Sequence, residues 1–596
     1  MIEPYYYDYW GNRVETSDAT RQALLTAIGS TVILSEASAA SEVEGPRCYL
    51  SRRMRDGKIW ALATQLYALR SRRNWGIGDF TDLAAFARLA GRAGASAVGL
   101  NPLHALHPSN PAAASPYSPS SRLFLNVLYI DVERVPELAE SPEARAAIGG
   151  PGFQDRLASL RDAPLVDYPG VAAAKFEILG RLHRVFRANH GARPYDRRAL
   201  AFRRFVRSRG LSLKHLAIYE ALAEHFRARN PDAYGWRQWP AEYQAPDSAT
   251  VAQFAGEHGE RVEFYLYLQF LAHEQLAAAA ATARDAGIRF YCDLAVGVET
   301  NGADAWSDRD AFAVDATLGA PPDPLNTFGQ NWGLAPLSPR ALRERAFEPF
   351  VTLLRANMRY GGILRIDHVM ALRRAFWIPR GASALNGAYV VYPMDELLGV
   401  LARESTRARC ATVGEDLGTV PEGFRERMQA VRALSSRLFY FERDWSDGTF
   451  LPPEHYPRLA AASIGTHDLP TLAGWWLGDR SAGEDRARDR FLLVDALEHA
   501  GALDAAGAGA LRDDAHAGGT PHALRALALG AHRFLNATAS LLAVVSIDDV
   551  LSETGAINVP GTFDEHPNWR RKLSLSLEDF DADGRLAITG TVMNRQ

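Results

Sequence analysis

The stretch Gly361-Gly362-Ile363-Leu364-Arg365-Ile366-Asp367-His368 decides the fold. Its apolar residues run without alternation, as in a parallel strand that is buried on both faces. Arg365, Asp367 and His368 then stand at the C-terminal end of the expected strand. In a barrel of parallel strands, that end carries the catalytic side chains. A carboxylate beside Arg365 is expected to have a lowered pKa and to stay ionised, which suits a nucleophile toward a cationic carbon.

Two further apolar segments end in the same way. Residues 411–414 lead into Glu415-Asp416, and residues 463–465 lead into Thr466-His467-Asp468. An Arg-x-Asp sequence is often a structural ion pair, and for the first stretch alone that alternative stays open. Three expected strands that carry carboxylates at the same relative position favour one shared site over separate packing roles.

Short apolar strands recur along the chain, with helices such as 80–93 and 262–286 between them. Eight strands that alternate with helices predict an α/β fold, a (β/α)8 TIM barrel. The expected strands are 59–63, 95–100, 289–295, 361–368, 410–414, 437–441, 461–465 and 539–546.

The spacing of these strands predicts how the chain is divided. A short N-terminal leader, 1–45, precedes the catalytic barrel, 46–596. The leader contains the aromatic-rich residues 5–10, a helix 19–28 capped by Ser17-Asp18, and a linker at Glu44-Gly45-Pro46. The gap after strand two, about 103–260, is expected to be a mostly helical inserted subdomain.

Two other segments are assigned by composition. Residues of about 308–339 are rich in Pro and Gly and are expected to form a loop insertion at the active-site face. Residues 501–519 are rich in Ala, Gly and Asp and are predicted to be a mobile surface segment.

Composition excludes several classes of protein. The 596 residues carry a formal net charge of -4, without the basic excess that a nucleic-acid partner requires. No signal peptide is visible and no apolar run reaches the roughly 18 residues of a membrane span, so a cytoplasmic location is expected. The cysteines, Cys48, Cys292 and Cys410, are too far apart and odd in number to indicate a disulfide framework or a metal site.

Asp367, Glu415 and Asp468 are the central candidate residues. Exchange of a glycosidic bond needs two carboxyl groups, one to attack the anomeric carbon and one to protonate the leaving oxygen. A third acid can hydrogen-bond sugar hydroxyls, and His368 and His467 are placed to do the same. The alternative for either histidine is a strand-end residue that only satisfies its own hydrogen bonds.

Three loops carry weaker signals. Tyr117, in the Pro-rich stretch 115–122, is either part of an ordinary turn or a platform on which a sugar stacks. Residues 74–80 contain Gly-x-Gly-Asp, an incomplete phosphate loop, and a turn with an Asp cap is the better interpretation. The loop 319–333, which carries Trp332, is either a lid or substrate arm or a structural Pro loop.

Together these segments resemble the 4-α-glucanotransferases of glycoside hydrolase family 77, called amylomaltases or disproportionating enzymes. The resemblance runs from about Asn74 to Lys572. It is specific because unrelated segments agree in order: 74–79, 115–118, 293–297, 321–323 with 329–333, 365–368, 414–418, 466–468, 560–562 and 567–572.

The resemblance implies a role for each candidate. Asp367 would be the nucleophile, Glu415 the general acid/base and Asp468 the transition-state stabiliser. The partners would be malto-oligosaccharides and α-1,4-glucans, with no metal or organic cofactor, and no oligomeric state follows. The implied substrate-binding residues are Arg365, His368, His467, Asp293, Tyr117, Trp332 and Asp323.

The expected reaction is a retaining double displacement that transfers an α-1,4-glucan segment to the 4-hydroxyl of an acceptor. Retention predicts a separation of roughly 5–5.5 Å between the two carboxyl groups. The alternatives are a hydrolase of the same superfamily and an inactive glucan-binding protein, which would be expected to lack at least one of the three acids. Longer family members carry an N-terminal β-rich extension that this leader largely lacks, and Asp323-Pro324-Leu325 stands where some members have aromatic residues.

Overall fold

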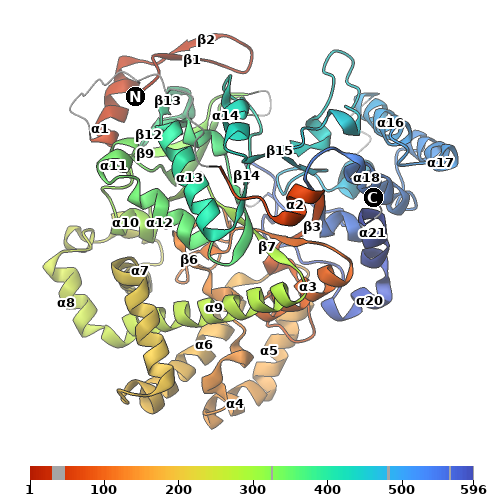
Figure 1. Ribbon diagram of the computed structural model, residues 1–596. Coiled ribbons are helices and arrows are strands. Elements are labelled where there is room, and N and C mark those ends of the chain that lie inside the picture. Colours follow the sequence, from red (N-terminus) through yellow and green to blue (C-terminus); the bar gives the residue numbers. More distant parts are fainter. Residues whose placement is uncertain (30–46, 324–325, 479–483, 563–564, 595–596) are drawn as a thin grey trace.

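Eight parallel strands of the described part of the chain close into a barrel, in the order β11-β14-β15-β16-β17-β3-β4-β7. Some of these strands, among them β3, β7, β14 and β15, are labelled in Figure 1. The predicted (β/α)8 fold is confirmed. The strands are short and mostly buried, as expected when helices cover a barrel whose interior is packed. They are β3 (Ile59–Thr64), β4 (Ala97–Leu100), β7 (Arg289–Leu294), β11 (Gly361–Ile366), β14 (Ala411–Gly414), β15 (Leu434–Leu438), β16 (Ala460–Ser463) and β17 (Leu542–Ser546).

The computed structural model describes residues 1–29, 47–323, 326–478, 484–562 and 565–594. The linker expected at Glu44-Gly45-Pro46 lies outside them. The sixth strand was expected at 437–441 but spans Leu434–Leu438, and Phe439–Phe441 is a 3-10 turn. The start of this strand was not recognised in the sequence because Ser435 and Ser436 are polar and interrupt the apolar run.

Helices follow the strands and pack around the barrel. The capped helix expected near the N-terminus is α1 (Asp18–Ile28). Ser17 accepts a hydrogen bond from the backbone of Thr20, and Gly29 ends the helix in the left-handed conformation. The helices nearest the barrel strands are α3 (Phe80–Arg92), α9 (Gly259–Asp285), α12 (Glu348–Asn357), α13 (Met394–Ala408), α14 (Phe424–Ala430), α18 (Leu524–Ala537) and α19 (Ile547–Leu551), with α21 (Arg585–Met593) against α18.

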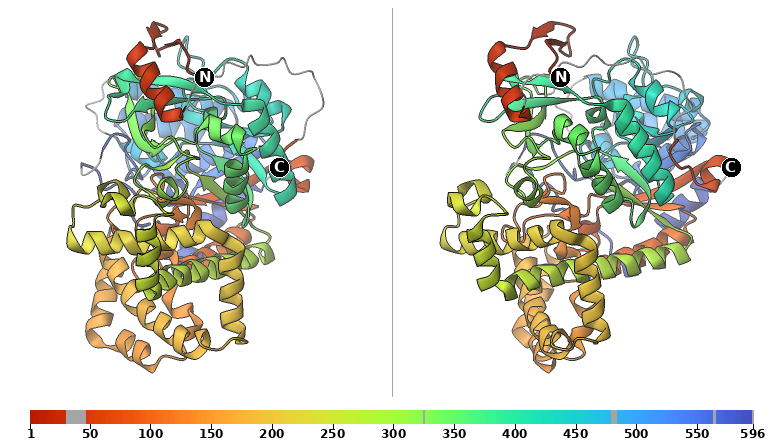
Figure 2. Two further views of the ribbon diagram at one scale, coloured as in Figure 1. Left: turned by 90° about the vertical axis from the view of Figure 1, so that its left-hand side faces the viewer. Right: turned by 60° about the vertical axis from the view of Figure 1, so that its left-hand side comes forward.

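The segment between β4 and β7 forms a helical layer beside the barrel, at the bottom of both views in Figure 2. The longest helix of this segment, α7, is interrupted at Gly210 (φ 63°, ψ -145°). The boundaries predicted for the leader and the insertions stay predictions. The helices of this layer are α4 (Pro142–Gly149), α5 (Pro151–Asp162), α6 (Tyr168–Phe186), α7 (Arg197–Arg229) and α8 (Ala249–Glu257).

A second sheet lies beside the barrel, with the order β13-β12-β9-β10-β8. The interpretation of 319–333 as a loop is therefore only partly right, because its two ends, 319–320 and 330–333, belong to β9 and β10, and residues 324–325 are not described. The first residues of the chain pair with the outer edge of β13: Glu3 N–H donates to Tyr389 (2.9 Å) and Val391 N–H to Met1 (2.7 Å). The strands are β8 (Val298–Glu299), β9 (Ala316–Ala320), β10 (Gln330–Ala335), β12 (Arg374–Pro379) and β13 (Ala388–Val391).

The prediction of a mobile segment at 501–519 is wrong, because Ala505–His516 is helix α17. Asp504 caps this helix by accepting the Gly507 N–H at 2.8 Å. Leu511 is buried against the neighbouring helices. Alanine is the best helix former, so an Ala-rich segment with an Asp cap orders once one face is covered.

The stretch 74–79 is a turn with an Asp cap, as expected. Asp79 accepts the backbone N–H groups of Thr81 and Asp82 in a capping box at the start of α3. Gly76 has a φ of +86°, and a Cβ there would lie 2.7 Å from Leu160 Cβ, so both backbone and space require glycine.

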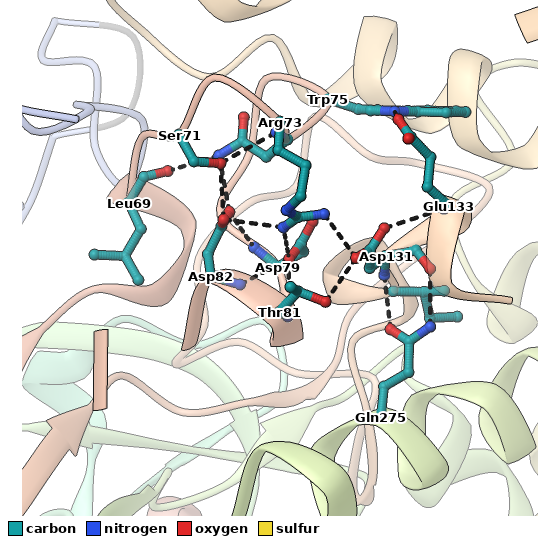
Figure 3. A network of polar contacts seen from close by, with 12 residues as sticks. Leu69, Ser71, Arg73, Trp75, Asp79, Thr81, Asp82, Asp131, Glu133 and Gln275 are labelled. Carbon is teal, nitrogen blue, oxygen red and sulfur yellow. Dashed lines mark hydrogen bonds and ion pairs between the residues drawn. The ribbon is translucent and has the colours of Figure 1, made fainter. Parts of the chain in front are cut away.

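Arg73 holds this turn to the rest of the molecule (Figure 3). Its guanidinium pairs with Asp79, with Asp82 (2.9 Å) and with Asp131 (2.6 Å). The three carboxylates are at most 3% exposed and Arg73 is 28% exposed. One partly buried cation therefore pairs directly with three buried carboxyl groups. The buried Lys175 adds positive charge nearby, and burial together with the neighbouring carboxylates raises the pKa of Asp79 to about 7.

We predict that Arg73→Leu lowers the free energy of unfolding by about 3–5 kcal/mol, because it leaves buried carboxylates without their counter-charge. The midpoint of urea unfolding measures this. Arg72→Leu is the matched control, since Arg72 forms an exposed pair with Asp579 and its loss is expected to cost less than about 1 kcal/mol. Equal midpoints for the two variants would contradict the prediction.

Candidate active site

The register of the parallel strands brings the candidate acids together at one mouth of the barrel. Arg365 on β11 lies opposite Asp293 on β7, and Ile366 lies opposite Gly414 on β14. Asp367 and Glu415 each follow directly after these positions. The ladder continues past the strand ends, since Glu415 N–H donates to Ile366 (3.0 Å) and Asp367 N–H to Leu294 (3.0 Å).

Arg365 joins two of these carboxylates. Its guanidinium Nη1 lies 2.8 Å and 2.9 Å from the carboxylate oxygens of Asp293 and 2.9 Å from Asp367 Oδ1. The Arg365 side chain is only 15% exposed. A buried guanidinium between two carboxylates satisfies its own charge and fixes the position of both anions.

Glu415 is held by main-chain donors rather than by a cation. His368 N–H donates to Oε2 and Leu417 N–H to Oε1, both at 2.8 Å. The adjacent acid, Asp416, has a different role. It accepts the Ser436 N–H at 2.8 Å and pairs with Arg425 at 2.8 Å, so it is a structural residue that ties β14 to β15.

Asp468 and His467 lie in the loop after β16 and form a pair. His467 Nε2 lies 3.3 Å from Asp468 Oδ2, and Asn558 Nδ2 donates to Asp468 Oδ1 at 2.6 Å. The backbone N–H of Asn558 also donates to the carbonyl of His467 at 3.1 Å. Asp468 is the most exposed of the three acids, with 45% of its side chain accessible.

Tyr117 links the two halves of this arrangement. Its hydroxyl donates to Asp293 at 2.5 Å, and its ring stacks on His467 with 4.5 Å between centroids. Trp569, in the left-handed conformation, lies 5.4 Å from Tyr117 and 5.1 Å from His467. One face of the Tyr117 ring is therefore covered by His467, which changes the expectation of a freely accessible platform.

Trp332 reaches the site from the second sheet. Its ring lies edge-on to His368, with 5.3 Å between centroids. His368 has positive φ and ψ (45° and 56°), a conformation that is uncommon outside glycine. His368 follows directly after Asp367, and in this conformation its backbone N–H points at the carboxylate of Glu415. The strained backbone therefore helps to hold Glu415 in the site.

A cavity of about 150 Å³ opens at this mouth, and its walls include Tyr117, Asp293, Arg365, Glu415 and His467. Asp367 and His368 line a second cavity of about 70 Å³ instead, and Asp468 and Trp332 line neither. Asp323 does not line them either; in the connection from β9 to β10 its carboxylate accepts the Asn326 N–H at 2.7 Å. The first cavity continues into the barrel between small residues, among them Ala63, Gly99 and Ala461.

The acids sit in different electrostatic environments. Burial raises the pKa of Asp367 to about 6; Arg365 opposes this shift, and the nearby Glu415 and Asp293 add to it. The expectation of a lowered pKa for Asp367 is therefore wrong, because desolvation and two like charges outweigh one cation. Burial also raises the pKa of Glu415.

The pKa of Asp468 is lowered, in contrast to the raised pKa values of Asp367 and Glu415, and His467 is the main cause of the lowering. Burial alone would raise the pKa of Asp468, but the charge and the hydrogen bond of His467 and the amide of Asn558 hold it at about 2. Asp468 thus stays ionised at any working pH, and the raised pKa of His467 favours its charged form.

The structure has the three acids at one mouth of the barrel, where the sequence predicted them, and their roles stay predictions. Two features of their surroundings were missed. Asn558 was not a candidate, although it stands two residues before the quoted stretch 560–562. The main-chain donors of Glu415 have no signal in the sequence, since any residue carries an N–H. Among the described residues, no group of three or more His, Cys, Asp and Glu is placed to hold a metal ion, and no helix is long and apolar enough to cross a membrane.

The family profile described as 4-alpha-glucanotransferase, glycoside hydrolase family 77, matches residues 64–577. The chain belongs to this family. A 4-alpha-glucanotransferase of Haemophilus influenzae is 37% identical over 552 residues, covering 87% of this chain and 76% of that protein. One of Mycobacterium bovis is 38% identical over 584 residues, covering 93% and 77%.

Solved structures of the glucanotransferase family agree with the fold. The amylomaltase of Corynebacterium glutamicum superposes with a TM-score of 0.84 at 26% identity, covering all of this chain and 98% of its own. An amylomaltase of Streptococcus agalactiae, in complex with acarbose, gives a TM-score of 0.73 at 19% identity, covering 90% of this chain and 99% of its own, a likeness of fold alone. The enzyme is thus a transferase that acts by glucan transglycosylation, and hydrolysis is not the favoured activity.

Proposed function

We propose that this glucanotransferase works by a retaining double displacement in which Asp367 is the nucleophile and Glu415 the general acid/base. The observation that carries the proposal is the contrast between two neighbouring carboxyls. Asp367 is paired with Arg365, whereas Glu415 forms no salt bridge with any described residue and is held by two N–H groups. Different environments for two carboxyls separate the attacking role from the proton-transferring role.

The first step breaks the α-1,4 bond of the donor. The Asp367 carboxylate attacks the anomeric carbon while Glu415 gives its proton to the leaving 4-oxygen. The products of this step are a β-glucosyl ester on Asp367 and a shortened glucan with a free 4-hydroxyl. In the second step the 4-hydroxyl of an acceptor glucan attacks the anomeric carbon of this ester, the bond to Asp367 breaks and frees its carboxylate, and Glu415 takes up the hydroxyl proton.

The remaining candidates are proposed to hold the sugar. Asp468 stays anionic and accepts hydrogen bonds from hydroxyls of the reacting ring, and Arg365, His467 and His368 surround the same ring. Tyr117, Asp293 and Trp332 complete the walls, and Asp323 is proposed to contact the glucan further along the loop. The proposed partners are malto-oligosaccharides and α-1,4-glucans, which the acarbose complex of the streptococcal amylomaltase supports.

We predict that Asp367→Asn abolishes transfer, by about 10³-fold or more, while the protein stays folded. The measurement is chromatography of the products of maltotriose, where transfer yields glucose and longer oligomers. Asp247→Asn is the matched control, because Asp247 is a carboxylate with 89% of its side chain exposed. Parent activity in Asp367→Asn would show that another group is the nucleophile.

Glu415→Gln tests the proton donor. The variant is expected to lose transfer from maltotriose by about 10²–10⁴-fold, because the leaving 4-oxygen is no longer protonated. It should still release fluoride in a burst from α-maltosyl fluoride, whose leaving group needs no proton, whereas Asp367→Asn should not. An equal loss of activity of Glu415→Gln with maltotriose and with α-maltosyl fluoride would contradict the assignment of Glu415 as the proton donor.

The pH dependence follows from the shifted groups. Asp367 attacks only as a carboxylate, and its pKa of about 6 means that kcat/KM should fall as the pH drops through 6. Glu415 acts first as an acid, and its raised pKa keeps the carboxyl protonated at pH values above the usual titration range of a glutamate. The profile should therefore be bell-shaped. A rate that stays level from pH 7 to pH 4.5 would contradict this order of ionisation.

A further inference from the structure

The hairpin formed by β1 (Tyr5–Tyr7) and β2 (Arg13–Glu15) exposes large aromatic side chains. Tyr7, Tyr9 and Trp10 are 58%, 63% and 54% exposed. Tyr6 instead points inward and packs edge-on against the rings of Phe376 and Tyr389. One inward ring thus anchors the hairpin to the second sheet and leaves the outer rings in water. Figures 1 and 2 show the hairpin standing out at the top of the molecule.

The outer rings contact one another, and the turn that carries them is closed by hydrogen bonds. Tyr9 and Trp10 lie edge to face with 6.1 Å between centroids, as Tyr5 and Tyr7 do at 5.8 Å. The turn between the strands is closed by Asp8, whose carboxylate accepts the backbone N–H and the side-chain amide of Asn12 at 2.8 Å and 3.0 Å. A ligand that stacks on these rings has little ordering entropy to overcome.

The cations around the rings pair with carboxylates, whereas the Asp8 carboxylate in the turn accepts hydrogen bonds from Asn12. Arg13 lies 2.8 Å from Glu15 with its guanidinium 3.9 Å above the Tyr5 ring, and Glu3 pairs with Arg374 at 2.7 Å. A patch whose cations are already paired offers no excess positive charge for an anionic partner. It fits a neutral ligand that has flat C–H faces for the rings and hydroxyls for the tyrosine O–H and the indole N–H.

We propose that this hairpin is a second binding site for α-1,4-glucan chains, separate from the catalytic mouth. The proposal rests on the glucan-transferring function, which brings neutral polyhydroxylated polymers to this protein. The hairpin packs against β12 and β13, and the same sheet carries Trp332 on β10 beside the catalytic residues. A long glucan held by the hairpin is thereby kept close to the protein between catalytic events.

The extent of the patch favours a glucan over a second copy of the chain. A stable protein interface buries roughly 800 Å² on each partner, with 20–30 residues a side. The hairpin offers two three-residue strands and one turn. Two or three stacked rings are enough to hold sugar units, because stacking needs only one ring for each sugar.

The test compares the parent with a Tyr9→Ala/Trp10→Ala double variant. Retardation in native gels that contain glycogen measures binding, and initial rates on maltotriose and on glycogen measure turnover. We expect the apparent affinity for glycogen to fall about three- to tenfold, the loss of one or two aromatic contacts. Turnover of maltotriose, too short to use the second site, should stay within about twofold of the parent. Tyr195→Ala is the matched control, since Tyr195 is 88% exposed elsewhere.

Further variants separate ring stacking from damage to the hairpin. Trp10→Phe keeps a ring and should keep most of the retardation, whereas loss of retardation in this conservative variant would overturn the proposal. Unchanged retardation of the double variant would also overturn it, as would an equal fall in both turnover rates. A change of molecular mass in gel filtration with unchanged retardation would assign the patch to contacts between copies. Activity of Asp367→Asn would contradict the proposed nucleophile but would not change the interpretation of the glycogen retardation measurements.

Discussion

The site depends on one buried cation, Arg365. The register of the parallel barrel places Asp367 and Glu415 at the same height on neighbouring strands and Asp293 two residues lower, opposite Arg365, so three carboxyls meet at one mouth. Without a counter-charge, their mutual repulsion and desolvation would protonate them or force them apart. Arg365 binds two of them directly and favours the charged form of the third. The fold thus brings the carboxyls together, and the guanidinium offsets part of their repulsion and desolvation.

The same cluster explains how identical functional groups differ in chemistry. Asp468 stands half in solvent with a cationic partner and is always ionised. Asp367 is buried among like charges and ionises only near pH 6, and Glu415 relies on neutral N–H donors. No residue type decides these roles, because aspartate and glutamate are nearly alike in water. The surroundings that the barrel supplies decide them.

The barrel and the three acids were predictable because their signals are local. Unbroken apolar runs mark buried parallel strands, and an acid after such a run must lie at the mouth. The failures have physical causes as well. The sixth strand was displaced because Ser435 and Ser436 lower its apolar character, and α17 was missed because its composition suggested disorder. The pKa of Asp367 depends on residues 293 and 415, whose distances from it are set by register, which one segment alone does not contain.

The pairing of the first residues with β13 has a consequence for how the molecule behaves among its neighbours. An uncovered strand edge presents free N–H and C=O groups on which other chains can add strands. Here Glu3 N–H and the Met1 carbonyl occupy part of that edge. Trimming those few residues would therefore do more than remove a loose end. It would expose the edge of β13, on which strands of other molecules could add. The enzyme could then aggregate although its catalytic barrel remained intact.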